Sequence, residues 1–143
     1  MRVLLKNRAL LKISGKDSEE FIQNQFSNDI EKLNHSSIQI NAYCQHQGKI
    51  IGLFWVMRYK DNFLLSFPLD LADVIKSRLQ IFVIMSDVII DDISASYSQI
   101  GLIDEKHSDA YSINDRLSLI IDNTIDKFNS KIEGNTEWTL ACI

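Results

Sequence analysis

The chain has 143 residues, of which 45% are hydrophobic and 24% charged. Its length suits one domain with a self-supporting core, and its composition excludes an intrinsically disordered protein. The net charge of −4, with basic residues scattered along the chain, argues against a nucleic-acid-binding surface. No apolar run is long enough to cross a bilayer and no signal-peptide core follows the N-terminus, so a cytoplasmic location is expected.

The first part of the chain predicts two short strands and a helix. Apolar residues at positions 3–5 and 9–13 are separated by Lys6-Asn7-Arg8, which is typical of a hairpin or a tight bend. Asp17 is expected to cap the N-terminus of the helix, with Glu20 completing a capping-box-like pattern. The apolar side of this helix and its continuation consists of Phe21, Ile22, Phe26, Ile30 and Leu33.

The middle of the chain predicts a meander of three antiparallel strands. Ile38, Ile40 and Ala42 alternate with more polar neighbours, as in a strand that is buried on one side. Residues 50–56 are nearly all apolar, which suits a central strand, and residues 63–67 follow as the third strand.

A second helix is expected over Asp70–Phe82, with Asp70 as its N-cap and Pro68 closing the strand before it. The remaining elements are expected in the order strand 88–93, strand 97–103, strand 117–121, helix 124–132 and a last helix that begins near Trp138. This order predicts the α+β class, with an antiparallel sheet and helices packed on one of its faces. A single domain is expected over residues 1–143.

Residue spacing alone reveals no catalytic or metal-binding motif. The sequence contains no nucleophile elbow, phosphate-binding loop or His-Glu-x-x-His motif. Cys44 and His46 can share one face of a strand as two metal ligands, but no further ligand follows at a recognisable spacing. A buried thiol beside a polar turn is the simpler interpretation of Cys44, and it and Cys142 are expected to be free thiols. The acidic pairs 91–92 and 104–105 suit solvated strand ends and loops.

Two blocks of sequence are more specific in combination. Residues 13–30 contain Ser14-Gly15, a helix that ends in Gln23-Asn24-Gln25, and the turn Ser27-Asn28-Asp29-Ile30. Residues 42–50 contain a Gly48-Lys49 turn between two strands. This combination resembles the superfamily of YgfZ-type proteins and the glycine-cleavage T-protein, an aminomethyltransferase. The resemblance extends over nearly the whole chain and implies the first, folate-binding-type domain, truncated before the cysteine motif that YgfZ-type proteins carry downstream.

The resemblance implies that this domain helps to enclose tetrahydrofolate or a derivative in a cavity shared with later domains. Trp138 stands where YgfZ-type proteins carry a folate-contacting tryptophan, and Arg8 stands where some members carry a second aromatic residue. An arginine in that place can stack on a ring or pair with a carboxylate of the ligand. The ordinary alternatives are a core tryptophan and a turn arginine.

Three functions remain open. The resemblance implies a folate-dependent accessory protein that assists assembly or repair of iron–sulfur proteins, its partners, and through them tRNA modification. One-carbon transfer is disfavoured, because the T-protein has acidic residues after its Gly-Gly turn whereas residues 48–53 here contain none, and Leu53 cannot take or orient a proton. The third is a truncated interaction domain without a ligand, which self-associates through an exposed apolar face around Trp138. Direct contact with nucleic acid or a membrane is not expected.

Overall fold

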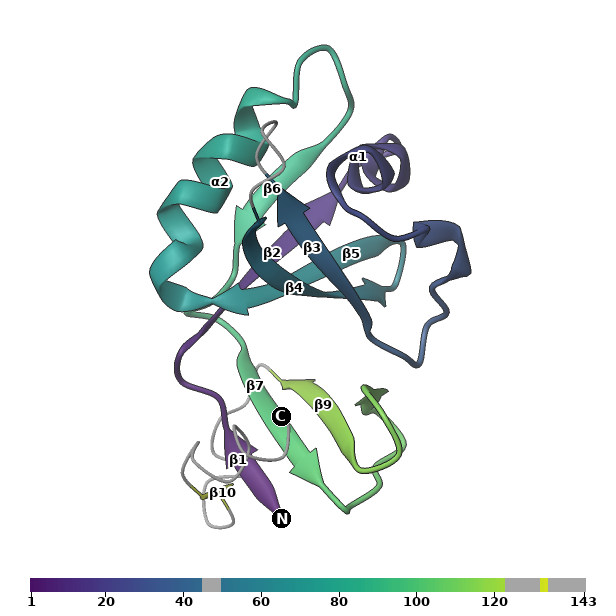
Figure 1. Cartoon of the computed structure of the whole chain (residues 1–143), viewed down its shortest axis with the longest axis vertical. Coiled ribbons are helices and arrows are strands. Elements are labelled where there is room, and N and C mark those ends of the chain that lie inside the picture. Colours follow the sequence, from purple (N-terminus) through teal and green to yellow (C-terminus); the bar gives the residue numbers. More distant parts are fainter. Residues whose placement is uncertain (45–49, 123–131, 134–143) are drawn as a thin grey trace.

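Two five-stranded sheets form the architecture of the computed structural model, which describes residues 1–44, 50–122 and 132–133. In Figure 1 the upper sheet has the strand order β3-β4-β5-β2-β6 and the lower sheet has the order β10-β1-β7-β9-β8. Neighbouring strands are antiparallel except β1 and β10, which are parallel. The strands are β1 (Arg2–Leu4), β2 (Arg8–Ser14), β3 (Gln39–Cys44), β4 (Ile50–Tyr59), β5 (Asn62–Pro68), β6 (Ile89–Asp92), β7 (Ser98–Ile103), β8 (Tyr111–Ser112), β9 (Leu117–Asp122) and β10 (Ile132–Glu133); the helices are α1 (Ser18–Gln25) and α2 (Ala72–Ile81), and the 3-10 turns are η1 (Ile30–Lys32) and η2 (Leu69–Leu71).

The α+β class is confirmed, with α1 and α2 packed on one face of the upper sheet (Figure 1). The expected meander of three antiparallel strands is present as β3, β4 and β5. The later strands that the sequence predicted are β6, β7 and β9. The strands divide into two sheets, however, and β7 and β9 belong to the lower one.

The connection between β1 and β2 is a tight bend, so the alternative expectation of a hairpin is wrong. β1 pairs with β7 in the lower sheet, whereas β2 pairs with β5 and β6 in the upper sheet. The backbone of this segment is used by other partners: the N–H of Leu5 donates to the carbonyl of Gln99 (2.8 Å), and the carbonyl of Asn7 accepts from the N–H of Leu69 (2.8 Å). The first residues of the chain therefore join the two sheets.

The core beneath the helices follows from strand alternation. Ala9 and Leu11 of β2 point toward the helices, whereas Leu10 points to the opposite face. Phe54 and Phe67 are fully buried on the helix side and stack with their ring centroids 4.7 Å apart. Burial of a side chain of this size contributes about 1.5–3 kcal/mol to stability. The helices complete this core with Phe21, Ile22, Ile75 and Leu79.

A second core lies between the two sheets. It contains Leu10, Met57 and Leu64 from the outer face of the upper sheet, which is the face opposite the helices. The residues that meet them are Val3, Leu5, Ile38, Ile103, Leu117 and Leu119. The lower sheet therefore covers part of the outer face of the upper sheet.

The start of α1 differs from the expected capping box. Asp17 precedes the helix but makes no side-chain cap; instead its Oδ2 accepts the backbone N–H of Asp87 (2.8 Å). Gly15 has φ of +108°, and a Cβ at this position would lie 2.1 Å from the carbonyl oxygen of Asp87. Glycine is required here because two chain segments touch. Asp70 also does not cap a helix with its side chain, since α2 begins after Leu71.

Strand β3 follows the expected burial only in part: Ile38, just before the strand, is buried as predicted, but the side of the strand that carries Ile40 is exposed. Ile40 is 47% exposed, whereas Asn41 and Tyr43 are buried. Burial of Asn41 is tolerated because its Oδ1 accepts the N–H of Asn28 (2.8 Å) and its Nδ2 donates to Oε1 of Gln39 (2.9 Å). The asparagine thus ties β3 to the turn after α1 and fixes which face of the strand points inward.

Two expected helices fall largely or wholly outside the described residues. Of the helix expected over 124–132, only Ile132 is described, and it belongs to β10. The helix expected from Trp138 lies outside the described residues. Within the described part of the chain, neither helix is long and apolar enough to cross a membrane.

Candidate functional site

The outer face of the upper sheet carries large apolar side chains that the lower sheet does not cover. Leu53 is 56% exposed and Ile40 is 47% exposed, although both lie on strands. Strand register places Ile40 opposite Trp55, and Ala42 opposite Leu53. Trp55 is half-buried, and Arg8 lies over it. We call Arg8, Ile40, Leu53 and Trp55 the outer strip.

Arg8 and Trp55 form a cation–aromatic pair. The guanidinium carbon of Arg8 is 3.8 Å from the centroid of the Trp55 ring, a geometry that contributes about 0.5–2 kcal/mol depending on desolvation. The Nε of Arg8 donates to the hydroxyl of Ser66 (3.0 Å), and its Nη2 donates to the Ser66 carbonyl (2.8 Å). Ser66 lies directly opposite Trp55 in the register of β4 and β5. One cross-strand pair therefore holds the arginine in a single orientation.

A buried polar network supports this pair from below. The hydroxyl of Ser66 donates to Oε1 of Gln99, and the Nε2 of Gln99 donates to the carbonyl of Ala9 (3.1 Å). Ser66 and Gln99 are both buried, and they belong to different sheets. The network thus fixes the lower sheet against the upper sheet directly beneath Arg8.

The structure describes one of the two ligand-binding residues that the sequence predicted. Arg8 belongs to the outer strip, where its guanidinium is stacked and hydrogen-bonded. Trp138 lies outside the described residues, so its role stays a prediction. Leu53, at the place where the T-protein is expected to carry an acidic residue, is exposed on the same face as Trp55.

Trp55 is the residue of this strip that the sequence reasoning missed. Its signal was available in the alternation of β4, because Phe54 and Val56 point into the helix-side core and Trp55 must then point away. The nearly continuous apolar run of residues 50–57 hid this alternation. Leu53 and Trp55 can be placed together on the outer face only after Phe54 and Val56 are assigned to the helix side.

Metal chemistry finds no support among the described residues. Cys44 is exposed rather than buried, and His46, its expected companion, lies outside the described residues. Within the ranges that the structure describes, no group of three His, Cys, Asp or Glu side chains converges as a metal site.

A polar hollow with a volume of about 490 Å³ lies between the sheets. Its lining includes His35, His107, Tyr59 and Tyr111. Burial raises the pKa of Tyr111, to which nearby Tyr59 adds a smaller electrostatic contribution. The hydroxyl of Tyr111 donates to the carbonyl of Arg58 (2.7 Å). This tyrosine therefore has a structural role at the junction of the two sheets.

Comparison with known proteins gives two sequence relatives. No protein-family model matches the chain. It is 30% identical over 94 residues to the tRNA-modifying protein YgfZ of Buchnera aphidicola subsp. Schizaphis graminum, a match that covers 66% of this chain and 30% of that protein. It is 36% identical over 53 residues to an aminomethyltransferase of Caldanaerobacter subterraneus subsp. tengcongensis, covering 37% of this chain and 14% of that protein. The matched regions thus span less than a third of either relative.

A solved structure shows the same fold. The glycine cleavage system aminomethyltransferase T from Bartonella henselae superposes with a TM-score of 0.72, over 93% of this chain and 46% of that chain, at 11% sequence identity. The chain therefore corresponds to less than half of that solved protein. At this identity the superposition shows a shared fold.

Proposed function

Because the chain is a domain of the YgfZ and aminomethyltransferase type, we propose that its outer strip forms one wall of a binding site for tetrahydrofolate or a derivative. The observation that carries this proposal is the Arg8–Trp55 pair beside exposed Leu53 and Ile40. The chain spans less than half the length of the relatives that it matches, and Trp138 is the second residue of this chain that we propose as a ligand contact.

The chemistry of the strip suits a flat ligand with an acidic tail. The faces of a pterin ring are apolar and aromatic, so they pack well on leucine, isoleucine and tryptophan side chains. The glutamate tail of a folate carries carboxylates, which favour a guanidinium as partner. Arg8 is held by Ser66 in a fixed orientation, which reduces the conformational entropy lost when a ligand binds.

The strip supports binding rather than aminomethyl transfer. Neither β3 nor β4 contains an aspartate or glutamate, and the position nearest the expected acids is Leu53. A transfer reaction needs a group that takes or orients a proton near the reacting nitrogen, and an apolar side chain does neither. The aminomethyltransferase alternative is therefore the weaker of the two.

We further propose that folate binding serves an accessory role in the assembly or repair of iron–sulfur proteins and, through them, in tRNA modification. The support is the relative that is named as a tRNA-modifying protein, together with the absence of acids from β3 and β4. Loss of the chain from its host should lower the level of tRNA nucleosides that iron–sulfur enzymes produce. Mass spectrometry of digested tRNA measures this, and unchanged levels would remove the accessory role while leaving folate binding untouched.

Calorimetric titration of the purified chain with tetrahydrofolate tests the binding site itself. The double variant Ile40→Ser with Leu53→Ser removes apolar contact area without touching either core, so binding should weaken about tenfold or more. The matched control is Val74→Ser with Ile81→Ser, two equally exposed residues of α2 on the other side of the sheet. Trp138→Ala tests the predicted second contact.

Two outcomes would contradict the proposal. Saturable binding that weakens equally in both double variants would mean that the strip has no special role. Absence of saturable binding by the intact chain would show that it does not bind folate by itself.

A further inference from the structure

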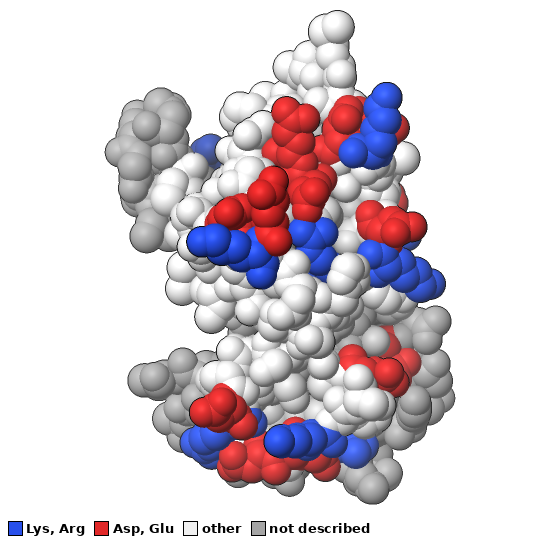
Figure 2. Space-filling view, turned by 90° about the vertical axis from the view of Figure 1, so that its right-hand side faces the viewer, with Lys and Arg blue, Asp and Glu red and all other residues white. Residues whose placement is uncertain are grey.

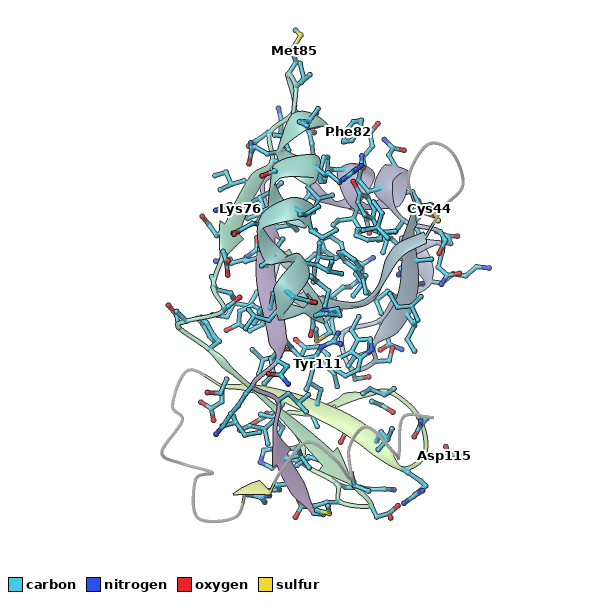
Figure 3. The ribbon with its side chains drawn as sticks, turned by 60° about the vertical axis from the view of Figure 1, so that its left-hand side comes forward. Cys44, Lys76, Phe82, Met85, Tyr111 and Asp115 are labelled. Carbon is cyan, nitrogen blue, oxygen red and sulfur yellow. The ribbon has the colours of Figure 1, made fainter. Side chains whose placement is uncertain are left out.

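The loop between α2 and β6 presents a cluster of exposed apolar side chains at one end of the molecule. We call residues 81–89 the apolar finger. Its large apolar side chains, each more than half exposed and Met85 completely so, are Ile81, Phe82, Ile84, Met85 and Ile89. Figure 3 shows Met85 at the extreme tip with Phe82 beneath it, and in Figure 2 the same end of the molecule is an uncharged knob. Exposed apolar clusters of this kind mark interaction sites.

The finger lies away from the outer strip. It precedes β6, which forms one edge of the upper sheet, whereas the strip residues Ile40 and Leu53 lie on β3 and β4 at the other edge. A function of the finger is therefore separate from ligand binding at the strip, and it goes beyond the proposed function.

The finger has a defined conformation. The N–H groups of Phe82 and Val83 continue the end of α2 by donating to the carbonyls of Leu79 (3.1 Å) and Gln80 (3.2 Å). The N–H of Val88 donates to the carbonyl of Ser86 (3.0 Å), and Val88 is buried in the helix-side core. An apolar loop that is already ordered loses little conformational entropy when it docks.

The base of the finger is fastened to the start of α1. The N–H of Asp17 donates to the carbonyl of Asp87 (3.1 Å), and Oδ2 of Asp17 accepts the N–H of Asp87 (2.8 Å). This pair of bonds needs the close approach of Gly15, which leaves no room for a Cβ. Two segments far apart in sequence thus hold the exposed side chains in place.

The charge around the finger is acidic. From Ile81 to Asp92 the chain contains three aspartates and no lysine or arginine, and Asp17 adds a fourth carboxylate at the base. Lys12, which is opposite Asp91 in strand register, Lys16, and Arg78 in the last turn of α2 offset part of this charge. An anionic membrane surface is disfavoured, because membrane-inserting loops rely on lysine and arginine beside their apolar residues. A second copy docked finger to finger is also disfavoured, since it would bring two acidic bases together.

We propose that the apolar finger inserts into an apolar groove with a basic rim on a partner protein. A convex apolar knob of large side chains fits a concave site, where the partner excludes water from Phe82, Ile84 and Met85. The aspartates at the base then face lysine or arginine side chains of the rim, which speeds association and makes it salt-dependent.

Photo-crosslinking in the cells that produce the chain identifies this partner. A p-benzoyl-phenylalanine introduced at Met85 should form one dominant adduct with another protein, and the same residue at Val74 serves as the control on the exposed side of α2. The captured protein is then purified and titrated against the whole chain. Phe82→Ser with Met85→Ser should raise its Kd about tenfold or more, whereas Ile40→Ser with Leu53→Ser at the outer strip should leave it unchanged.

Measurements of salt dependence and of vesicle binding distinguish the proposed partner protein from a second copy of the chain and from a membrane. The Kd for the purified partner should rise with ionic strength, and Asp87→Asn with Asp91→Asn should slow association while reducing that salt dependence. Adducts between two copies of the chain, or binding to phosphatidylcholine–phosphatidylglycerol vesicles, would overturn the proposal. It would also be overturned if adducts at Met85 were no stronger than at Val74, or if the Kd of the purified partner were the same for the finger variants and the unchanged chain.

Discussion

The two faces of the upper sheet are built from the same strands but differ in how completely other elements cover them. On the helix side, Phe54 and Phe67 are fully buried beneath α1 and α2. On the outer face, one residue along from Phe54, Leu53 is 56% exposed and stands beside a half-buried tryptophan. On the helix side the apolar residues are covered, whereas on the outer face the lower sheet covers only some of them.

This difference indicates that the covered face contributes mainly to stability, whereas the exposed residues of the outer face are available for function. Side chains of the closed face contribute to folding through area removed from water, so their replacement is costly everywhere. Leu53 and Ile40 on the open face contribute little to folding, because water already reaches them. Large apolar residues kept in such a place are better explained by a ligand or by further protein that covers them.

The neighbouring residues Phe54 and Leu53 give the largest contrast. Phe54→Ala should lower the free energy of unfolding by about 3–5 kcal/mol, since it empties a buried site that stacks on Phe67 and contacts two further rings. Leu53→Ala should change it by less than about 0.5 kcal/mol. Urea denaturation measures both. Similar losses for the two variants would mean that the outer face is as closed as the helix side.

Gly15 tests whether the finger depends on its base. Gly15→Ala should destabilise the chain by about 1–3 kcal/mol or more, because φ of +108° disfavours a side chain and the new Cβ would meet the Asp87 carbonyl. Hydrogen exchange should also speed up at the backbone N–H groups of Asp17 and Asp87, which bond across this contact. Faster exchange in α2 but not at the base would contradict the fastening described above.

Gln99 tests the contact between the sheets. Gln99→Ala leaves the buried Ser66 hydroxyl without its acceptor, so stability should fall by about 1–3 kcal/mol. Arg8 should lose orientation as well, and in a Trp138→Phe background its contact with Trp55 can be followed through the fluorescence of that tryptophan. Stability that is unchanged in this variant would show that the apolar core alone holds the lower sheet.

Local patterns in the sequence were sufficient for most elements of the upper sheet. The apolar run of residues 9–13 and the helical spacing of residues 71–82 depend on neighbours within a few positions, and both predicted their elements correctly. The division into two sheets was not predictable in this way, because Arg2 pairs with Leu102, a partner about a hundred residues away. The exposure of Ile40 was also missed, because Tyr43 packs with two aromatic rings of the helix-side core and thereby turns the opposite side of β3 outward.

The candidate site was predictable only in part for the same reason. Arg8 was found through a resemblance, whereas its partner Trp55 lies on a strand four elements later and meets it across β5. The apolar finger carried no signal in the sequence beyond a hydrophobic run, which suits a buried segment equally well. Exposure of these residues is a property of the tertiary fold.

The smallest expected effect concerns Tyr111, at the junction of the two sheets. Burial raises its pKa in the folded chain above the unfolded value near 10.0. The stabilisation tied to its neutral form is therefore complete below pH 10 and is lost as the pH rises through the folded pKa, because the unfolded chain ionises first. Tyr111→Phe removes this ionisation together with the hydrogen bond to Arg58, so it should cost about 1 kcal/mol at neutral pH and flatten the decline at alkaline pH.

Burial also raises the pKa of Tyr43 on the helix side, with Arg78 opposing the shift, so part of the decline should persist in the variant. Urea denaturation at pH 8 and at pH 10.5 measures the difference. A decline that is just as steep without Tyr111 would assign the alkaline sensitivity to the closed face, and the junction between the sheets would then be insensitive to pH.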